Sequence, residues 1–178
     1  MNMLEEIKKE IESERNVKQA EILQRFFKTG KGQYGEGDVF LGIKVPILRR
    51  IANKYKDIEL NNIKELLESN IHEYRLVALF ILVSRFEKHP NERKQIFEFY
   101  LDNVKNINNW DLVDLSAPNI VGRYIFNSGK ENPILARKLF KMSESSNIWE
   151  RRISIISTFY FIKNNRFDET LAISEILL

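Results

Sequence analysis

The sequence predicts an all-α fold of helical hairpins stacked into a curved α–α superhelix, and three observations support this fold class. Apolar residues recur at helical spacing through most of the 178 residues. Gly and Pro are scarce, at seven and four, which favours long helices over many short strands. A short motif also returns along the chain at intervals of 38 and 39 residues. Such a period is typical of arrays of paired helices.

The N-terminal part, residues 1–28, is expected to hold two helices, because its apolar residues are three or four positions apart. A glycine-rich loop is expected over residues 29–42. Its stretch Gly30-x-Gly32-x-x-Gly35 formally matches a phosphate-binding loop, but that motif requires a preceding strand and here a helix precedes. We therefore interpret the segment as a long flexible loop. A place beside a nucleic-acid backbone is the functional alternative, since long loops in compact proteins often bind partners.

The repeats are expected to occupy residues 45–178, after a helix over 45–55. Three helix pairs follow, with apolar residues at 60–67 and 72–86, at 97–104 and 110–126, and at 134–140 and 149–163. The starts of the second helices superpose as NIHEYR, NNWD and NIWERR, beginning at residues 70, 108 and 147. Asn is a good helix N-cap, and an acid in the first turn suits the helix dipole. HEAT or armadillo-type repeats have this organisation.

The last segment, residues 168–178, has the pattern of the first helix of another pair, so the last repeat is expected to be incomplete. A terminal repeat normally needs a polar cap, and truncation at the C-terminal end is the explanation we prefer. The whole chain, residues 1–178, is expected to form a single repeat domain.

Composition excludes several classes of protein. With no Cys there is no disulfide, thiolate zinc site or cysteine nucleophile, which fits a reducing cytoplasm. The charged N-terminus does not resemble a signal peptide, and the apolar stretches are too short to span a membrane. The two histidines, His72 and His89, are interpreted as an ordinary helix-start residue and a loop residue. We expect neither a metal nor a cofactor. A net charge of +3 alone predicts no partner.

The most informative residues are two aromatic and two charged side chains in the last repeats. Trp110 and Asp114 are four positions apart and share a helix face. Trp149 and Arg152 begin the second helix of the next repeat, so all four side chains are able to converge on one cleft. The structural alternatives are that both Trp residues are core anchors and that Asp114 pairs with a basic residue of a neighbouring repeat. Arg75 and Arg152 are repeat equivalents, which favours a structural ladder role for at least one of them.

Three motifs in this order resemble the AlkD-like DNA alkylation repair family. They are YGEGDVFLGIKVPILRRIANKY at residues 34–55, NNWDLVDLSAPNIVG at 108–122 and NIWERRISI at 147–155. The resemblance covers nearly the whole chain. It implies HEAT-like helical pairs and a DNA glycosylase that removes cationic N3- and N7-alkylated purines. It also implies an open concave groove that holds duplex DNA without a pocket for an extruded base.

The resemblance assigns roles to individual residues. Trp110 and Asp114 match active-site positions, with Asp114 stabilising the oxocarbenium ion and orienting water, and Trp110 contacting the lesion nucleotide. Arg152 matches a DNA-contacting arginine, although a slip of one residue would select Arg151. Trp149 lies beside it in the same motif and is included among the DNA-binding candidates. The family has a second cleft-lining Trp in a later helix, before which this chain ends.

Charge alone adds Lys44, Arg49 and Arg50 as further candidate DNA contacts, although each is equally explained as part of a solvated face. The expected partner is duplex DNA carrying alkylated purines. A protein with the full repeat array is expected to be a monomer, and a bacterial, cytoplasmic location is expected. Two rival functions remain. One is a non-catalytic DNA-binding relative, and the other is a HEAT-repeat scaffold that binds proteins.

Overall fold

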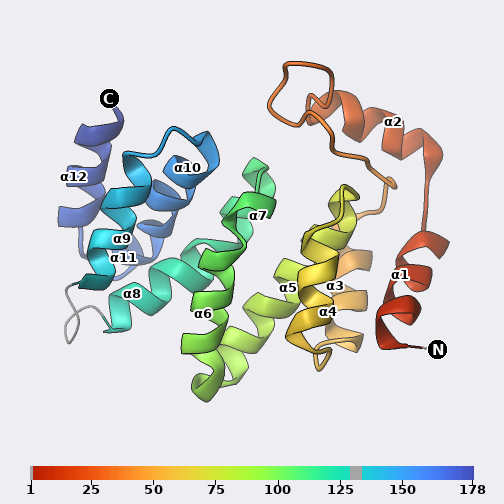
Figure 1. The fold of residues 1–178 in the computed structure, drawn as a ribbon, viewed down its shortest axis with the longest axis horizontal. Helices are drawn as coiled ribbons and strands as arrows, with labels where there is room; N and C mark the ends of the chain where they lie inside the picture. Colours follow the sequence, from red (N-terminus) through yellow and green to blue (C-terminus); the bar gives the residue numbers. More distant parts are fainter. Residues whose placement is uncertain (1, 129–133) are drawn as a thin grey trace. The chain divides into compact units, whose positions relative to one another are not determined.

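The computed structural model describes residues 2–128 and 134–178, and helices dominate both ranges (Figure 1). In these ranges the only β structure is an isolated bridge between Val39 and Ile71. The prediction of an all-α fold is therefore confirmed. The chain divides into two compact units, residues 1–84 and 85–178, and each is described by itself. The expectation of a single domain stays a prediction. None of the helices in the described ranges has the length and apolar character needed to cross a membrane.

The N-terminal unit contains five helices within the described residues, of which α5 belongs to it as far as Ser84. They are α1 (Met3–Ser13), α2 (Val17–Phe26), α3 (Val45–Lys54), α4 (Leu60–Leu67) and α5 (His72–Lys88). Asn2 and Asn16 cap α1 and α2, because their side chains accept bonds from backbone N–H groups in the first turn. Helix α1 packs against α3. Buried Ile7 and Ile51 belong to the core of this unit.

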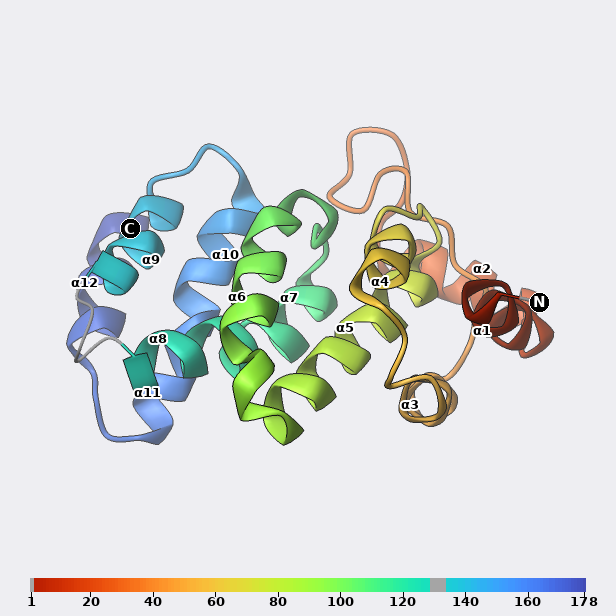
Figure 2. The ribbon, with the colours of Figure 1, turned by 60° about the horizontal axis from the view of Figure 1, so that its bottom comes forward.

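The C-terminal unit repeats a pattern of a first helix followed by a second one. Its described elements are η1 (Pro90–Glu92), α6 (Arg93–Asp102), η2 (Val104–Asn106), α7 (Trp110–Ser116), η3 (Pro118–Gly122), α8 (Arg123–Ser128), α9 (Ile134–Ser143), α10 (Ile148–Ser157), α11 (Phe159–Lys163) and α12 (Asp168–Leu177). Helix α10 packs against α9 within its hairpin, against α7 of the preceding hairpin and against α12 of the next segment. The second helices α7 and α10 therefore lie side by side, as in a stacked repeat array (Figure 2).

Two second helices that the sequence pattern predicts as continuous are broken. The helix expected over 110–126 divides into α7, the π-helical turn η3 and α8. Pro118 has no N–H, so it cannot continue the ladder of backbone bonds, and the N–H of Gly122 instead bonds Ala117 O at 2.9 Å. The helix expected over 149–163 divides at Thr158, whose N–H bonds Ile155 O at 3.1 Å. The apolar pattern persists across both breaks and conceals them.

The C-terminal part of the glycine-rich segment is anchored, contrary to the expectation of a flexible loop. Asp38 Oδ1 lies 2.5 Å from Arg75 Nη2, and Asp38 Oδ2 lies 3.2 Å from His72 Nδ1. All three side chains are buried, and the His72 ring stacks on Phe40 with centroids 4.4 Å apart. His72 begins α5, as the sequence predicts, but it is also a core residue that holds this segment, a role that the sequence pattern does not predict.

A second buried carboxylate fixes the entry to α3. Glu73 accepts hydrogen bonds from the backbone N–H groups of Leu41, Gly42 and Ile43 at 2.8–3.3 Å. Gly42 has a φ of +84°, and a side chain there would collide with the backbone of α2. The acid and the glycine together explain the path of the chain at residues 41–43, just before α3.

Replacing Asp38 with Asn should lower the free energy of unfolding by about 3–5 kcal/mol, because Arg75 would be left as a buried cation without a full counter-charge. Urea denaturation measures this loss. Glu14→Gln is the matched control, because it removes a partly exposed carboxylate from Arg50 and should cost at most about 1 kcal/mol. Equal effects of the two substitutions would contradict the anchoring role.

Candidate active site

Asp114 and Trp110 are placed by helix α7. Asn109 caps this helix, with its Oδ1 accepting the N–H of Trp110 at 2.8 Å. Both side chains are half-buried, so neither is sealed in the interior. The opposite face of α7 carries Leu112 and Val113, which are fully buried. The amphipathic pattern of the motif thus turns the indole and the carboxylate away from the core.

Arg152 meets Asp114 through a two-pronged ion pair. The Nε of Arg152 donates to Asp114 Oδ1 at 2.8 Å, and its Nη2 donates to Oδ2 at 2.7 Å. This geometry matches the planar fork of arginine to the two carboxylate oxygens, and it joins α7 to α10. The side chains are 36% and 37% exposed, respectively, so the pair is open to a ligand from solvent. The structural alternative, in which Asp114 pairs with a basic residue of a neighbouring repeat, is thus observed as the contact with Arg152.

Arg151 is directed elsewhere. Its Nη1 donates to the carbonyl oxygens of Ser145 and Ser146, at 2.8 and 3.2 Å, and so holds the turn that precedes α10. Of the two adjacent arginines, Arg152 is therefore the one that reaches the α7 carboxylate. Trp149 lies in the first turn of α10, where Asn147 Oδ1 accepts its N–H at 2.8 Å, and its side chain is half-buried.

A buried polar contact supports α7 from beneath. The Tyr100 hydroxyl of α6 lies 3.0 Å from Ser116 Oγ, and Ser116 Oγ donates to Leu112 O at 2.5 Å. The phenol is therefore the donor to Ser116. Burial raises the pKa of Tyr100 well above its usual range, and the negative charge of Asp114 raises the pKa further. The sequence pattern marks Tyr100 only as an apolar position of an amphipathic helix, so its polar role was missed.

The basic candidates Lys44, Arg49 and Arg50 belong to the N-terminal unit and are exposed. Arg50 pairs with Glu14 at 2.7 Å. The guanidinium carbon of Arg49 lies 4.2 Å from the centre of the Phe80 ring. Both arginines thus have contacts within their own unit, so the alternative that each is only part of a solvated face does not describe them fully.

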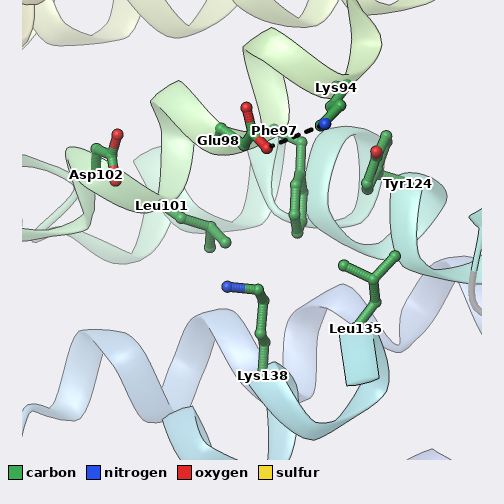
Figure 3. A pocket seen from close by; sticks show the side chains of 8 residues that line it. All are labelled: Lys94, Phe97, Glu98, Leu101, Asp102, Tyr124, Leu135 and Lys138. Carbon is green, nitrogen blue, oxygen red and sulfur yellow. Dashed lines mark ion pairs between the residues drawn. The ribbon is translucent and has the colours of Figure 1, made fainter. Parts of the chain in front are cut away.

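Besides a hollow between α1 and Tyr55, two hollows lie on other elements. One, of about 330 Å³, is formed by α6, α8 and α9, where Phe97 stacks on Tyr124 and Lys138 extends toward Leu101 (Figure 3). The other, of about 590 Å³, is lined mainly by residues of α2 and the segment that follows it. Neither is lined by a candidate catalytic or DNA-binding residue. Within the described residues, no group of three or more His, Asp and Glu side chains is arranged to hold a metal ion.

The accessible acid, arginine and indoles lie on consecutive second helices of a helical-repeat protein, a class whose stacked repeats form extended binding surfaces. Comparison with known protein families identifies the family within this class. The model of the family described as DNA alkylation repair enzyme matches residues 7–178, and the chain belongs to that family. Its general role is therefore DNA alkylation repair, with DNA as the partner that this role implies. No curated relative matches the chain at a significant level.

The two adjacent arginines should respond differently to replacement by Ala. Loss of Arg151 removes charge-assisted bonds to two carbonyls and should lower the free energy of unfolding by about 1.5–3 kcal/mol. Loss of Arg152 breaks an ion pair that is one-third exposed, so the cost should stay below about 1 kcal/mol. Urea denaturation of both variants measures the difference. A larger loss of stability for Arg152→Ala would show that this arginine is chiefly structural.

Proposed function

We propose that this protein is a DNA glycosylase that hydrolyses the N-glycosidic bond of cationic N3- or N7-alkylated purines, with Asp114 as the catalytic carboxylate. Membership of the DNA alkylation repair enzyme family supports the repair role. The observation that carries the finer assignment is the accessible ion pair between Asp114 and Arg152.

A comparison within the chain supports a functional interpretation of this pair. Arg75 and Arg152 are repeat equivalents, and each pairs with an aspartate. The Arg75–Asp38 pair is buried, with both side chains 4% exposed, whereas the Arg152–Asp114 pair is about one-third exposed. Burial of the first pair agrees with an anchoring role. Exposure of the second leaves charged groups where a phosphodiester and a sugar can reach them.

The carboxylate of Asp114 keeps the capacity that the reaction needs. A carboxylate offers about four lone-pair sites, and Arg152 uses two of them. As the bond between C1′ and the purine nitrogen stretches, its electrons move to the purine, which leaves as a neutral base. Positive charge then develops on the sugar, and a fixed carboxylate stabilises it. Water adds to C1′ and loses a proton, and the product is an abasic nucleotide.

Arg152 serves DNA binding in this proposal without leaving Asp114. A guanidinium has five N–H groups. The pair with Asp114 uses the single N–H on Nε and one of the two on Nη2. The remaining N–H groups are available to a phosphate oxygen, which is a good partner for arginine. Trp110, on the same helix as Asp114, offers an indole face that attracts a cationic ring. Trp149 provides a second indole at the start of α10.

Replacing Asp114 with Asn should reduce the single-turnover rate of 7-methylguanine release from methylated duplex DNA by about 100- to 1000-fold. Asn keeps the size of the side chain but cannot supply the negative charge. The matched control is Asp111→Asn in the same helix, where the side chain accepts the nearby backbone N–H of Leu112 and is not joined to Arg152. The control should release base at close to the wild-type rate. Wild-type protein that binds DNA but releases no base would instead establish the non-catalytic DNA-binding alternative.

Binding to unmodified duplex should weaken as salt rises, because phosphate contacts release counterions. If Lys44 is one such contact, Lys44→Gln should reduce the slope of log affinity against log salt by about one. Lys94→Gln is the control, since Lys94 lies on α6 and pairs weakly with Glu98 at 4.0 Å. Fluorescence anisotropy at several salt concentrations provides the measurement. Equal slopes for Lys44→Gln and wild type would remove Lys44 from the DNA-binding surface.

A further inference from the structure

We propose that Gly122 is a positioning residue for the Asp114–Arg152 pair, because its lack of a side chain allows the chain segment carrying Asp114 to lie directly against the end of α10. This inference rests on the proposed function for its catalytic meaning. The geometric part is independent of it and concerns the separation of two packed segments, α7–η3 and α10.

Gly122 is required by space and not by backbone conformation, since its φ is not in the left-handed region. A Cβ at this position would overlap the carbonyl oxygen of Ser157 and lie 3.2 Å from Tyr160 Cβ. The obstructing atom is backbone, so a change of rotamer cannot relieve the collision. Any larger residue at position 122 therefore has to separate η3 from the end of α10.

The π-helical turn delivers Gly122 to this contact. Pro118 interrupts the α-helical ladder, and the bond from Gly122 N to Ala117 O closes a wider turn. Ala117 and Gly122 are fully buried within this packing, and Ala117 O lies 3.5 Å from Ser157 Oγ. Elements η3, α10 and α11 are in mutual contact here. Small side chains on both sides thus let the two backbones approach closely.

The same two segments meet a second time at the ion pair. Asp114 precedes Gly122 by about two helical turns, and Arg152 precedes Ser157 by about one and a half. The segments therefore run in the same direction, with the backbone contact at one end and the pair at the other. Both bonds of the pair are short, at 2.8 and 2.7 Å, and a two-pronged geometry tolerates little displacement. A larger separation between Gly122 and Ser157 should therefore lengthen the two hydrogen bonds between Arg152 and Asp114.

The test compares Gly122→Ala with Arg152→Lys, which keeps the positive charge but loses the fork. Each single substitution should lower the single-turnover rate of 7-methylguanine release about tenfold. If Gly122 acts through the pair, the double variant should be no more than about threefold slower than either single variant. Losses that multiply to about 100-fold would overturn the proposal, because they would mean that Gly122 acts independently of Arg152.

A second readout does not depend on activity. The NMR signal of the Arg152 Nε–H reports its bond to Asp114, and Asp114→Asn should shift that signal. Gly122→Ala should shift it by at least half as much. Ile173→Ala, which opens a cavity in the core at α12 but leaves Gly122 in place, should not shift it. An unchanged signal in folded Gly122→Ala protein would overturn the proposal, even if wild type proves to be an active glycosylase.

If Gly122→Ala does not fold, Ser157→Thr tests the same packing from the other segment, since it adds one methyl group to a side chain that contacts Ala117 O and keeps the hydroxyl that donates to Ile153 O. The same shift of the Nε–H signal is expected, and its absence counts against the proposal. A wild-type protein that releases no base but shows these shifts would support the positioning role and refute the glycosylase assignment.

Discussion

The packing of α7 and η3 against α10 is the constraint on which the candidate site depends. The hairpins of the C-terminal unit bury their apolar sides against one another, and this brings the second helices α7 and α10 together in parallel. Their separation is set by side chains as small as those of Ala117 and Gly122. At this separation, an arginine from one repeat reaches an aspartate of the preceding one with both prongs of its guanidinium. The repeat geometry thereby supplies a preorganised carboxylate.

The chain uses the same pair of charged groups in two environments. Around Asp38 and Arg75 the charges are buried, and removal of one partner would cost stability, so the pair holds the C-terminal part of the glycine-rich segment in place. Around Asp114 and Arg152 the charges are partly solvated and contribute little to stability. A pair that stabilises weakly but keeps its geometry is the arrangement expected of a site that binds DNA and acts on it. Environment, and not residue type, separates the two roles.

Much of the fold was predictable from the sequence, because helical periodicity and the repeated Asn-capped motif depend only on local spacing. The breaks at Pro118 and Thr158 were missed, since the apolar pattern continues across both. The buried role of His72, beyond its expected place at the start of a helix, was missed for a different reason. Its partner Asp38 lies 34 residues earlier in a segment without periodicity, so no local pattern predicts their contact. Similarly, the proximity of Trp110 and Asp114 follows from spacing, whereas the choice of Arg152 over Arg151 required the direction of each side chain.

The partial exposure of the Asp114–Arg152 pair supports the assignment of Asp114 as the catalytic carboxylate in the proposed function. A fully buried pair would shield the carboxylate from a sugar, and an unpaired carboxylate on a half-exposed helix would sample several rotamers. Arg152 restricts Asp114 while leaving lone pairs on the carboxylate and N–H groups on the guanidinium for other partners. In the proposed reaction the leaving group is already cationic and needs no strong acid, so a fixed negative charge is the main requirement. An aspartate held in this way satisfies that requirement with residues from only two helices.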